Sequence, residues 1–93
     1  TEVITDLQEN LNELSKKYNK EVMVVEVGGE DHKIENTKEL LSATIKAVRN
    51  VPNYKGLGVF YWEPQGAKPW SGYQLNCWQD NGRPSPALDA FLY

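Results

Sequence analysis

The run GLGVFYWEP, residues 56–64, decides how the rest of the chain is interpreted. Its uncharged part before Glu63 predicts a strand that is apolar on both faces, as strands of parallel sheets are. Glu63 and Pro64 end this strand, because proline cannot donate a hydrogen bond to a neighbouring strand. Alternation of side chains puts Trp62 on the same face as Phe60 and puts Glu63 on the opposite face.

An earlier apolar run, Val22–Val25, ends in the same way, with the carboxylate Glu26 followed by Val27 and two glycines. This β-branched run also predicts a strand of a parallel sheet. Alternation puts Val22, Val24 and Glu26 on one face. If the sheet belongs to a barrel, we expect that face to point to the barrel interior.

Helical periodicities surround the two strands. The apolar positions of the first predicted helix are Val3, Ile4, Leu7, Leu11, Leu14 and Tyr18. A second predicted helix begins at Asn36, which has capping-box spacing with Glu39, and ends before Pro52. A long loop then leads from the second strand to a last helix, with Ser85 as its N-cap and Pro86 as its first residue.

This order of elements predicts an α/β fold in which two parallel strands are joined by a crossover helix. Two strands alone cannot bury both faces and both edges of a parallel sheet. The chain also begins on the edge of a helical pattern, with no signal peptide and no initiator methionine. We therefore expect a piece of a larger α/β protein, or a chain that recruits a partner to complete its sheet.

Composition argues against several classes of function. The net charge is −3 and the basic residues are scattered, so we expect neither nucleic acid nor a membrane as a partner. No apolar run approaches the roughly 20 residues of a membrane span. The single cysteine, Cys77, excludes an internal disulfide, and we expect a buried, unreactive thiol.

The candidate site lies where the two strands end. In barrels of alternating strands and helices, functional side chains gather at the carboxyl ends of the strands. Glu26 and Trp62 occupy such ends on the two predicted strands. Glycoside hydrolysis requires a carboxylate beside the anomeric carbon, and the C–H face of a sugar ring packs on an indole. This pair of residues therefore suits sugar chemistry.

Residues 56–64 resemble the eighth-strand motif of the family-53 glycoside hydrolases, which are arabinogalactan endo-β-1,4-galactanases. The run EVMVVE, residues 21–26, resembles their seventh strand, which ends in the catalytic nucleophile. The segments 14–20 and 80–91 fit the same pattern, so the resemblance covers essentially the whole chain. Two departures lie in the loops, where Val27 replaces a usual threonine and Gln65-Gly66 replaces a frequent Ala-Trp pair.

The resemblance implies that residues 1–93 form a single partial domain, the C-terminal part of a (β/α)8 TIM barrel. It implies a retaining endo-hydrolase of galactan or arabinogalactan, with Glu26 as nucleophile and with Trp62 and Trp70 in contact with the substrate. The acid/base would be a second glutamate on the fourth strand, upstream of Thr1, so this piece alone is expected to be inactive. No cofactor is implied, and the family's substrates imply a protein that is secreted, periplasmic or held at the cell surface.

Structural alternatives exist for each candidate residue. Glu26 could be a strand-end carboxylate that pairs with a base, and Trp62 an indole that caps the core. The loop aromatics Trp70, Tyr73 and Trp78 could pack their loop onto its own scaffold instead of binding sugar.

The acidic loop could be interpreted as a metal cluster, formed by Glu30, Asp31, His32 and Glu35. Some members of the family hold calcium in a longer version of this loop, with alternating acidic residues that are missing here. We therefore expect a solvated loop with an exposed His32 and no metal.

Three classes of function stay open: a galactanase that is active only as a whole barrel, a carbohydrate-binding module, and a structural domain that oligomerises through open strand edges. The strand–helix–strand order argues against the second, because most polysaccharide-binding modules are all-β. The expected partners are the polysaccharide and either the rest of the barrel or a second copy of the chain.

Overall fold

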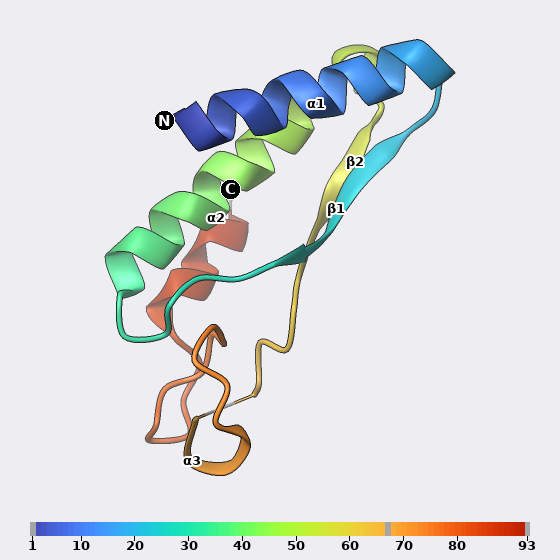
Figure 1. The fold of residues 1–93 in the computed structure, drawn as a ribbon. Coiled ribbons are helices and arrows are strands. Elements are labelled where there is room, and N and C mark those ends of the chain that lie inside the picture. Colours follow the sequence, from blue (N-terminus) through green and yellow to red (C-terminus); the bar gives the residue numbers. More distant parts are fainter. Residues whose placement is uncertain (1, 67, 93) are drawn as a thin grey trace.

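The computed structural model describes residues 2–66 and 68–92, without the side chains of Glu2, Lys68 and Trp70. The elements in chain order are α1 (Glu2–Tyr18), β1 (Val22–Val27), α2 (Ile34–Arg49), the 3-10 helix η1 (Pro52–Tyr54), β2 (Gly56–Tyr61), the short α3 (Lys68–Ser71) and the 3-10 helix η2 (Pro86–Leu92), as Figure 1 shows. The predicted order is confirmed, although the last helix is 3-10 and not α-helical.

The two strands pair in parallel, as the connecting helix requires. Val22 lies opposite Gly56, Val24 opposite Val59, and Val27 opposite Tyr61. The register shifts twice between these pairs, so each strand carries an irregularity of the β-bulge kind. A bulge breaks the simple alternation of side chains, and this changes which residues share a face.

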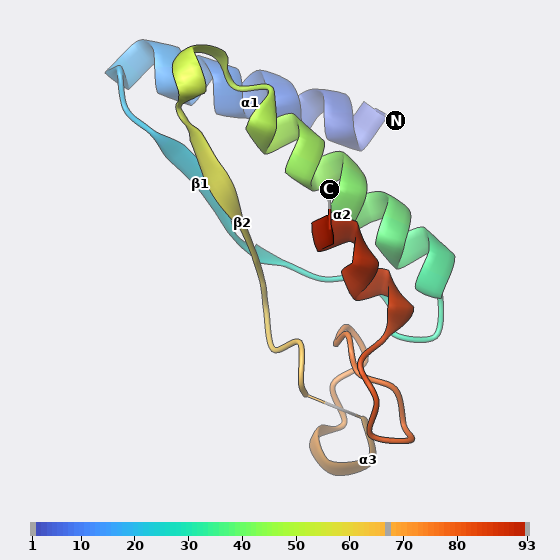
Figure 2. The ribbon, with the colours of Figure 1, turned by 180° about the vertical axis from the view of Figure 1, so that it is seen from behind.

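All the helices that pack on the sheet lie on one side of it, as both views of the ribbon show (Figures 1 and 2). A first buried cluster joins α1 and α2 to the strands and contains Leu11, Ala47, Val48 and Val51, with Leu7, Val22, Val24 and Val59 packed against it. A second cluster lies nearer the strand ends and contains Leu41, Cys77, Ala87 and Ala90, with Val27 and Tyr61 among the residues packed against it.

These contacts correct the predicted orientation of β1. Val22 and Val24 contact the helices, so they do not form layers of a barrel interior below Glu26. The opposite face of the sheet is the one left open, and it carries Val25, Leu57 and Phe60, with 60%, 57% and 61% of their surfaces exposed. Gly58 also faces open space, because an added Cβ would meet no atom within 4 Å.

Of the two helix starts predicted from the sequence, the start of α2 is wrong and the start of the last helix is confirmed. The α2 helix begins at Ile34, before Asn36, and its N-cap Lys33 makes no side-chain capping bond, so the capping box is wrong. Instead, the hydroxyl of the buried Thr37 donates to the carbonyl of Glu30 at 2.9 Å and fixes the turn. The cap of the last helix is confirmed, because the Ser85 hydroxyl accepts from the Ala87 N–H at 3.2 Å.

None of the described helices is long and apolar enough to cross a membrane.

Candidate functional site

A pocket of about 230 Å³ opens at the carboxyl ends of the two strands. One wall is the end of β1 and the residues after it, from Glu26 to Gly28. The facing residues are Trp62, just beyond β2, and Tyr73 and Leu75 from the loop that follows. The structure therefore brings Glu26 and Trp62 together, as the strand-end argument predicted.

Glu26 reaches this pocket by a different route from the predicted one. The register shift between Val24 and Val27 lets both valines contact the helices, although they are three positions apart. Val25 and Glu26 are both exposed, and Glu26 lies on the side away from the helices because its neighbour Val27 packs inward. The bulge, and not strict alternation, directs the carboxylate to the site.

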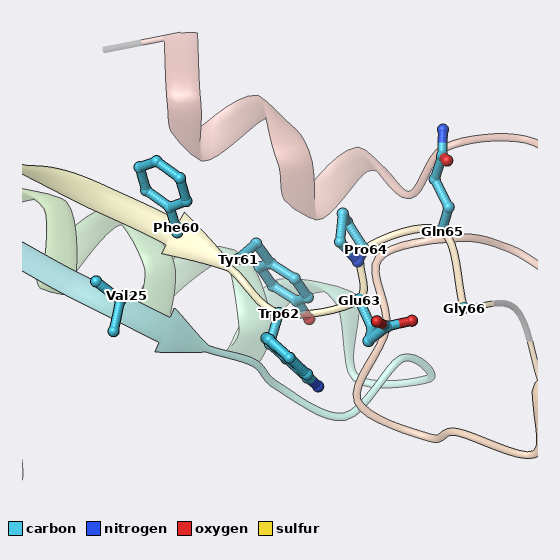
Figure 3. Close-up of a pocket in the computed structure, with 8 residues that line it drawn as sticks. All are labelled: Val25, Phe60, Tyr61, Trp62, Glu63, Pro64, Gln65 and Gly66. Carbon is cyan, nitrogen blue, oxygen red and sulfur yellow. The ribbon is translucent and has the colours of Figure 1, made fainter.

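A second, wider hollow of about 520 Å³ adjoins the first. Val25 of β1 and the run from Phe60 to Gly66 line it, as Figure 3 shows. Trp62 lines both hollows, and half of its surface is exposed. Its indole therefore stands between them and does not cap the core.

Glu63 does not point away from Trp62 as alternation predicted. The strand ends at Tyr61, and Glu63 has a φ of 48°, in the left-handed region that few residues other than glycine adopt. Its exposed side chain lines the wider hollow together with Trp62. Both strand-end glutamates therefore border the same open region.

The hydroxyl of Tyr61 connects the two strand-end loops. It accepts a hydrogen bond from the N–H of Gly29 at 3.1 Å and donates to the carbonyl of Leu75. The amide N–H of Trp62 donates to the carbonyl of Val27 at 3.0 Å, beside this junction. Burial, followed by a hydrogen bond with the Cys77 thiol, raises the pKa of Tyr61, so the phenol stays protonated.

The amide of Asn76 makes a second connection. Its nitrogen donates to the Asp31 carboxylate at 3.0 Å and to the carbonyl of Tyr73 at 2.7 Å, while its oxygen accepts from the Trp78 N–H at 2.7 Å. Asn76 is fully buried, so these bonds replace all contact with water. They hold the loop on which Tyr73 faces Glu26.

The loop aromatics have separate places. The side chain of Trp70 lies outside the described part of the structure. Trp78 pairs with Pro84 across the turn at residues 79–83 and does not line the Glu26 pocket. Tyr73 does line it, and the sequence signalled this residue only as one of several loop aromatics. Asn76 and Tyr61 carried no signal as site residues.

The acidic loop is solvated only in part, because Glu30, His32 and Glu35 are exposed whereas the Asp31 side chain is 9% exposed and accepts from Asn76. Lys33 lies 2.9 Å from the Glu30 carboxylate, and this hydrogen bond lowers the pKa of Glu30. His32 is exposed, as predicted. In residues 2–66 and 68–92, no group of three or more His, Cys, Asp or Glu side chains is placed to hold a metal ion. Cys77 is buried, and burial raises the pKa of its thiol, in agreement with the predicted unreactive cysteine.

Comparison with known protein families assigns the sequence to one of them. The sequence model of glycosyl hydrolase family 53 matches residues 29–91, more than half of the chain. The chain belongs to glycosyl hydrolase family 53. The family-53 match includes α2, β2, Trp62 and the loop to η2, and it begins just beyond Glu26. A search of curated proteins finds no match.

Family membership confirms the resemblance seen in the 56–64 motif and makes this chain part of a group of glycoside hydrolases. The observed α/β arrangement with two parallel strands agrees with that assignment. The pocket contains groups that glycoside hydrolysis can use: the carboxylate of Glu26, the indole of Trp62 and the phenol of Tyr73.

Proposed function

We propose that this chain supplies the nucleophile side of the active site of a retaining endo-β-1,4-galactanase, with β1 and β2 as the last two strands of a (β/α)8 barrel. The observation that carries the proposal is the pocket shared by Glu26 and Trp62 at the carboxyl ends of two parallel strands. The family resemblance of residues 21–26 and 56–64 supports the same assignment.

In this reaction the Glu26 carboxylate attacks the anomeric carbon and forms a covalent glycosyl–enzyme, which water then hydrolyses. Protonation of the leaving oxygen needs a second carboxylic acid about 5 Å away, supplied by another strand of the barrel. Trp62 and Tyr73 face the sugar bound next to Glu26, where an aromatic face packs on C–H groups and excludes water. Contact of Trp70 with the substrate is proposed from the family resemblance alone.

The open face of the sheet supports the barrel part of the proposal. Val25, Leu57 and Phe60 are more than half exposed, which is costly for aliphatic and aromatic side chains on one contiguous face. In a closed barrel this face becomes the packed interior. The partners proposed are therefore galactan or arabinogalactan and the remaining strands of the barrel. A polymeric plant substrate places the enzyme outside the cytoplasm, secreted or at the cell surface.

The direct test expresses the full reading frame that contains residues 1–93 and follows reducing ends released from β-1,4-galactan. Glu26→Ala is expected to lower kcat by about 1,000-fold or more, because the nucleophile acts in the transition state. Glu21→Ala is the matched control, since Glu21 is an exposed glutamate just before β1, at the end far from the pocket. It is expected to keep activity within about twofold of the parent.

Glu63 provides the competing assignment, because it also borders the open region beside Trp62. Glu63→Ala is expected to keep a measurable kcat, since a nucleophile on β1 is still present. Full activity of Glu26→Ala together with loss of activity in Glu63→Ala would transfer the nucleophile to Glu63 and overturn the proposal.

A further inference from the structure

The pocket around Glu26 is formed by two separate loops. The segment 26–28 follows β1, whereas Tyr73 and Leu75 belong to the loop that follows β2. The two loops approach closely at Gly28, where an added Cβ would lie 3.1 Å from the carbonyl oxygen of Leu75. The width of the pocket thus depends on what joins these loops.

The Tyr61 hydroxyl lies at that junction. It accepts from Gly29 N–H on the Glu26 side at 3.1 Å, donates to Leu75 on the other side, and lies 3.2 Å from the carbonyl of Asn76. The Tyr61 ring packs against the cluster of Leu41 and Cys77, so its position is set by the core. Burial raises the pKa of the phenol above its ordinary value, so the hydroxyl keeps its proton and acts as a donor at neutral pH.

We propose that Tyr61 is a positioning residue, whose hydroxyl sets the separation between the Glu26 segment and the Tyr73–Leu75 loop. This inference rests on the proposed function, because it makes the attack geometry of Glu26 depend on Tyr61. Tyr61 does not act on the sugar itself; it acts through the backbone of Gly29 and Leu75. A displacement of about 1 Å in such a site costs up to about 100-fold in rate.

The test uses Tyr61→Phe in the full reading frame, because this variant keeps the packed ring and removes only the hydroxyl. On β-1,4-galactan, kcat is expected to fall about tenfold or more while KM stays within about threefold, since sugars bound away from Glu26 keep their contacts. The pH profile is expected to keep its shape at a lower height. Tyr54→Phe is the control and should match the parent, because Tyr54 is 99% exposed on η1.

A purely structural role would lower the thermal midpoint and leave kcat of the folded enzyme unchanged, and that result would overturn the proposal. Amide hydrogen exchange supplies a readout that does not depend on activity. In Tyr61→Phe the peptides that contain Gly29 and Asn76 are expected to exchange about tenfold faster or more, with no change in Tyr54→Phe. Unchanged exchange in Tyr61→Phe would also overturn it. If the parent protein has no galactanase activity, the proposed function is contradicted. The amide hydrogen exchange of Tyr61→Phe still shows, independently of activity, whether the Tyr61 hydroxyl joins the two loops.

Discussion

At the residue scale, the indole of Trp62 is the side chain shared by the two hollows at the strand ends. Half of its surface is exposed, although an indole is among the side chains that gain most from burial. The backbone N–H of Trp62 donates a hydrogen bond to the carbonyl of Val27, so the backbone that carries the exposed ring is held in place. This combination fits a surface that becomes covered when substrate binds.

Trp62→Ala is therefore expected to lower kcat/KM on β-1,4-galactan by about tenfold or more, which corresponds to the aromatic contact energy of about 1.4 kcal/mol. Steady-state kinetics of the full reading frame measure this effect. Tyr54→Ala is the control, because it removes an aromatic ring that is 99% exposed on η1 and lines neither hollow at the strand ends. An unchanged kcat/KM for Trp62→Ala would show that the indole does not contact the sugar.

Tyr61 and Cys77 make the stability of the fold sensitive to alkaline pH. Burial raises the pKa of both groups above their ordinary values of 10.0 and 9.0. Their neutral forms are retained in the folded state, while the unfolded chain loses these protons first. The stabilisation is complete below about pH 9 and is lost as the pH rises.

Urea unfolding of the full protein at pH 7, 9 and 10.5 measures this dependence. The free energy of unfolding is expected to fall with rising pH, and to fall less steeply in Tyr61→Phe than in Tyr54→Phe. Equal pH dependence in the two variants would mean that Tyr61 ionises as easily in the folded protein as in the unfolded chain.

The candidate site was predictable from the sequence in its residues but not in all of its geometry. Glu26 and Trp62 share a pocket because Glu26 lies at the end of β1, Trp62 directly follows β2, and the two strands pair in parallel; the apolar runs before these residues carry that information. The faces of β1 were predicted wrongly, because the bulges depend on how two strands pair and leave no local signal. Tyr61 and Asn76 were missed for a similar reason, since each has a hydrogen-bond partner distant in sequence: the backbone of Gly29 for Tyr61 and the carboxylate of Asp31 for Asn76.

At the element scale, the packing of β2 on α2 requires glycine at its first position. A Cβ at Gly56 would overlap the carbonyl oxygen of Val48, which is backbone and cannot move aside. Gly58, two residues later on the same strand, faces open space and meets no atom within 4 Å. The two glycines therefore form a matched pair on opposite faces of one strand.

Gly56→Ala is expected to destabilise the fold by about 3 kcal/mol, at the upper end of overpacking costs, whereas Gly58→Ala is expected to be within about 1 kcal/mol of neutral. Thermal unfolding of the full protein that contains residues 1–93, followed by circular dichroism, compares them. Equal midpoints for the two variants would contradict the observed contact between the start of β2 and the end of α2.

Helix and strand existence followed from sequence periodicity, because each element has a clear apolar pattern. The first helix ends at Tyr18 as predicted, with Asn19 at a φ of 52°. The start of α2 was misplaced because the Thr37–Glu30 hydrogen bond, and not a capping box, fixes the turn before it. A helix start that is fixed by a loop contact, as the start of α2 is, has no characteristic spacing in the sequence and therefore cannot be located from it.

At the scale of the whole molecule, the described fold has helices on one face of its sheet and none on the other (Figures 1 and 2). Several apolar residues of α1 also point to solvent, namely Val3, Leu14 and Tyr18. Because the open sheet face is apolar and α1 exposes these three apolar residues among its charged ones, the fold offers surfaces on which the other units of the proposed barrel would pack.

The 93-residue chain by itself is therefore expected to self-associate and to bind a dye that reports exposed apolar surface. Sedimentation velocity and dye fluorescence measure these properties, and Phe60→Lys, on the open face, is expected to weaken both. A stable, well-folded monomer that binds no dye would contradict the proposal that this face is completed by other strands.

The most direct test of the central claim is to identify the residue that becomes covalently bound to the sugar. A 2-deoxy-2-fluoro galactoside with a good leaving group slows hydrolysis of the glycosyl–enzyme, so that the intermediate of a retaining enzyme accumulates. Peptide mass spectrometry of the full protein after this treatment is expected to find the added sugar on Glu26. A label on Glu63, or hydrolysis of galactan without any label on Glu26, would contradict the account.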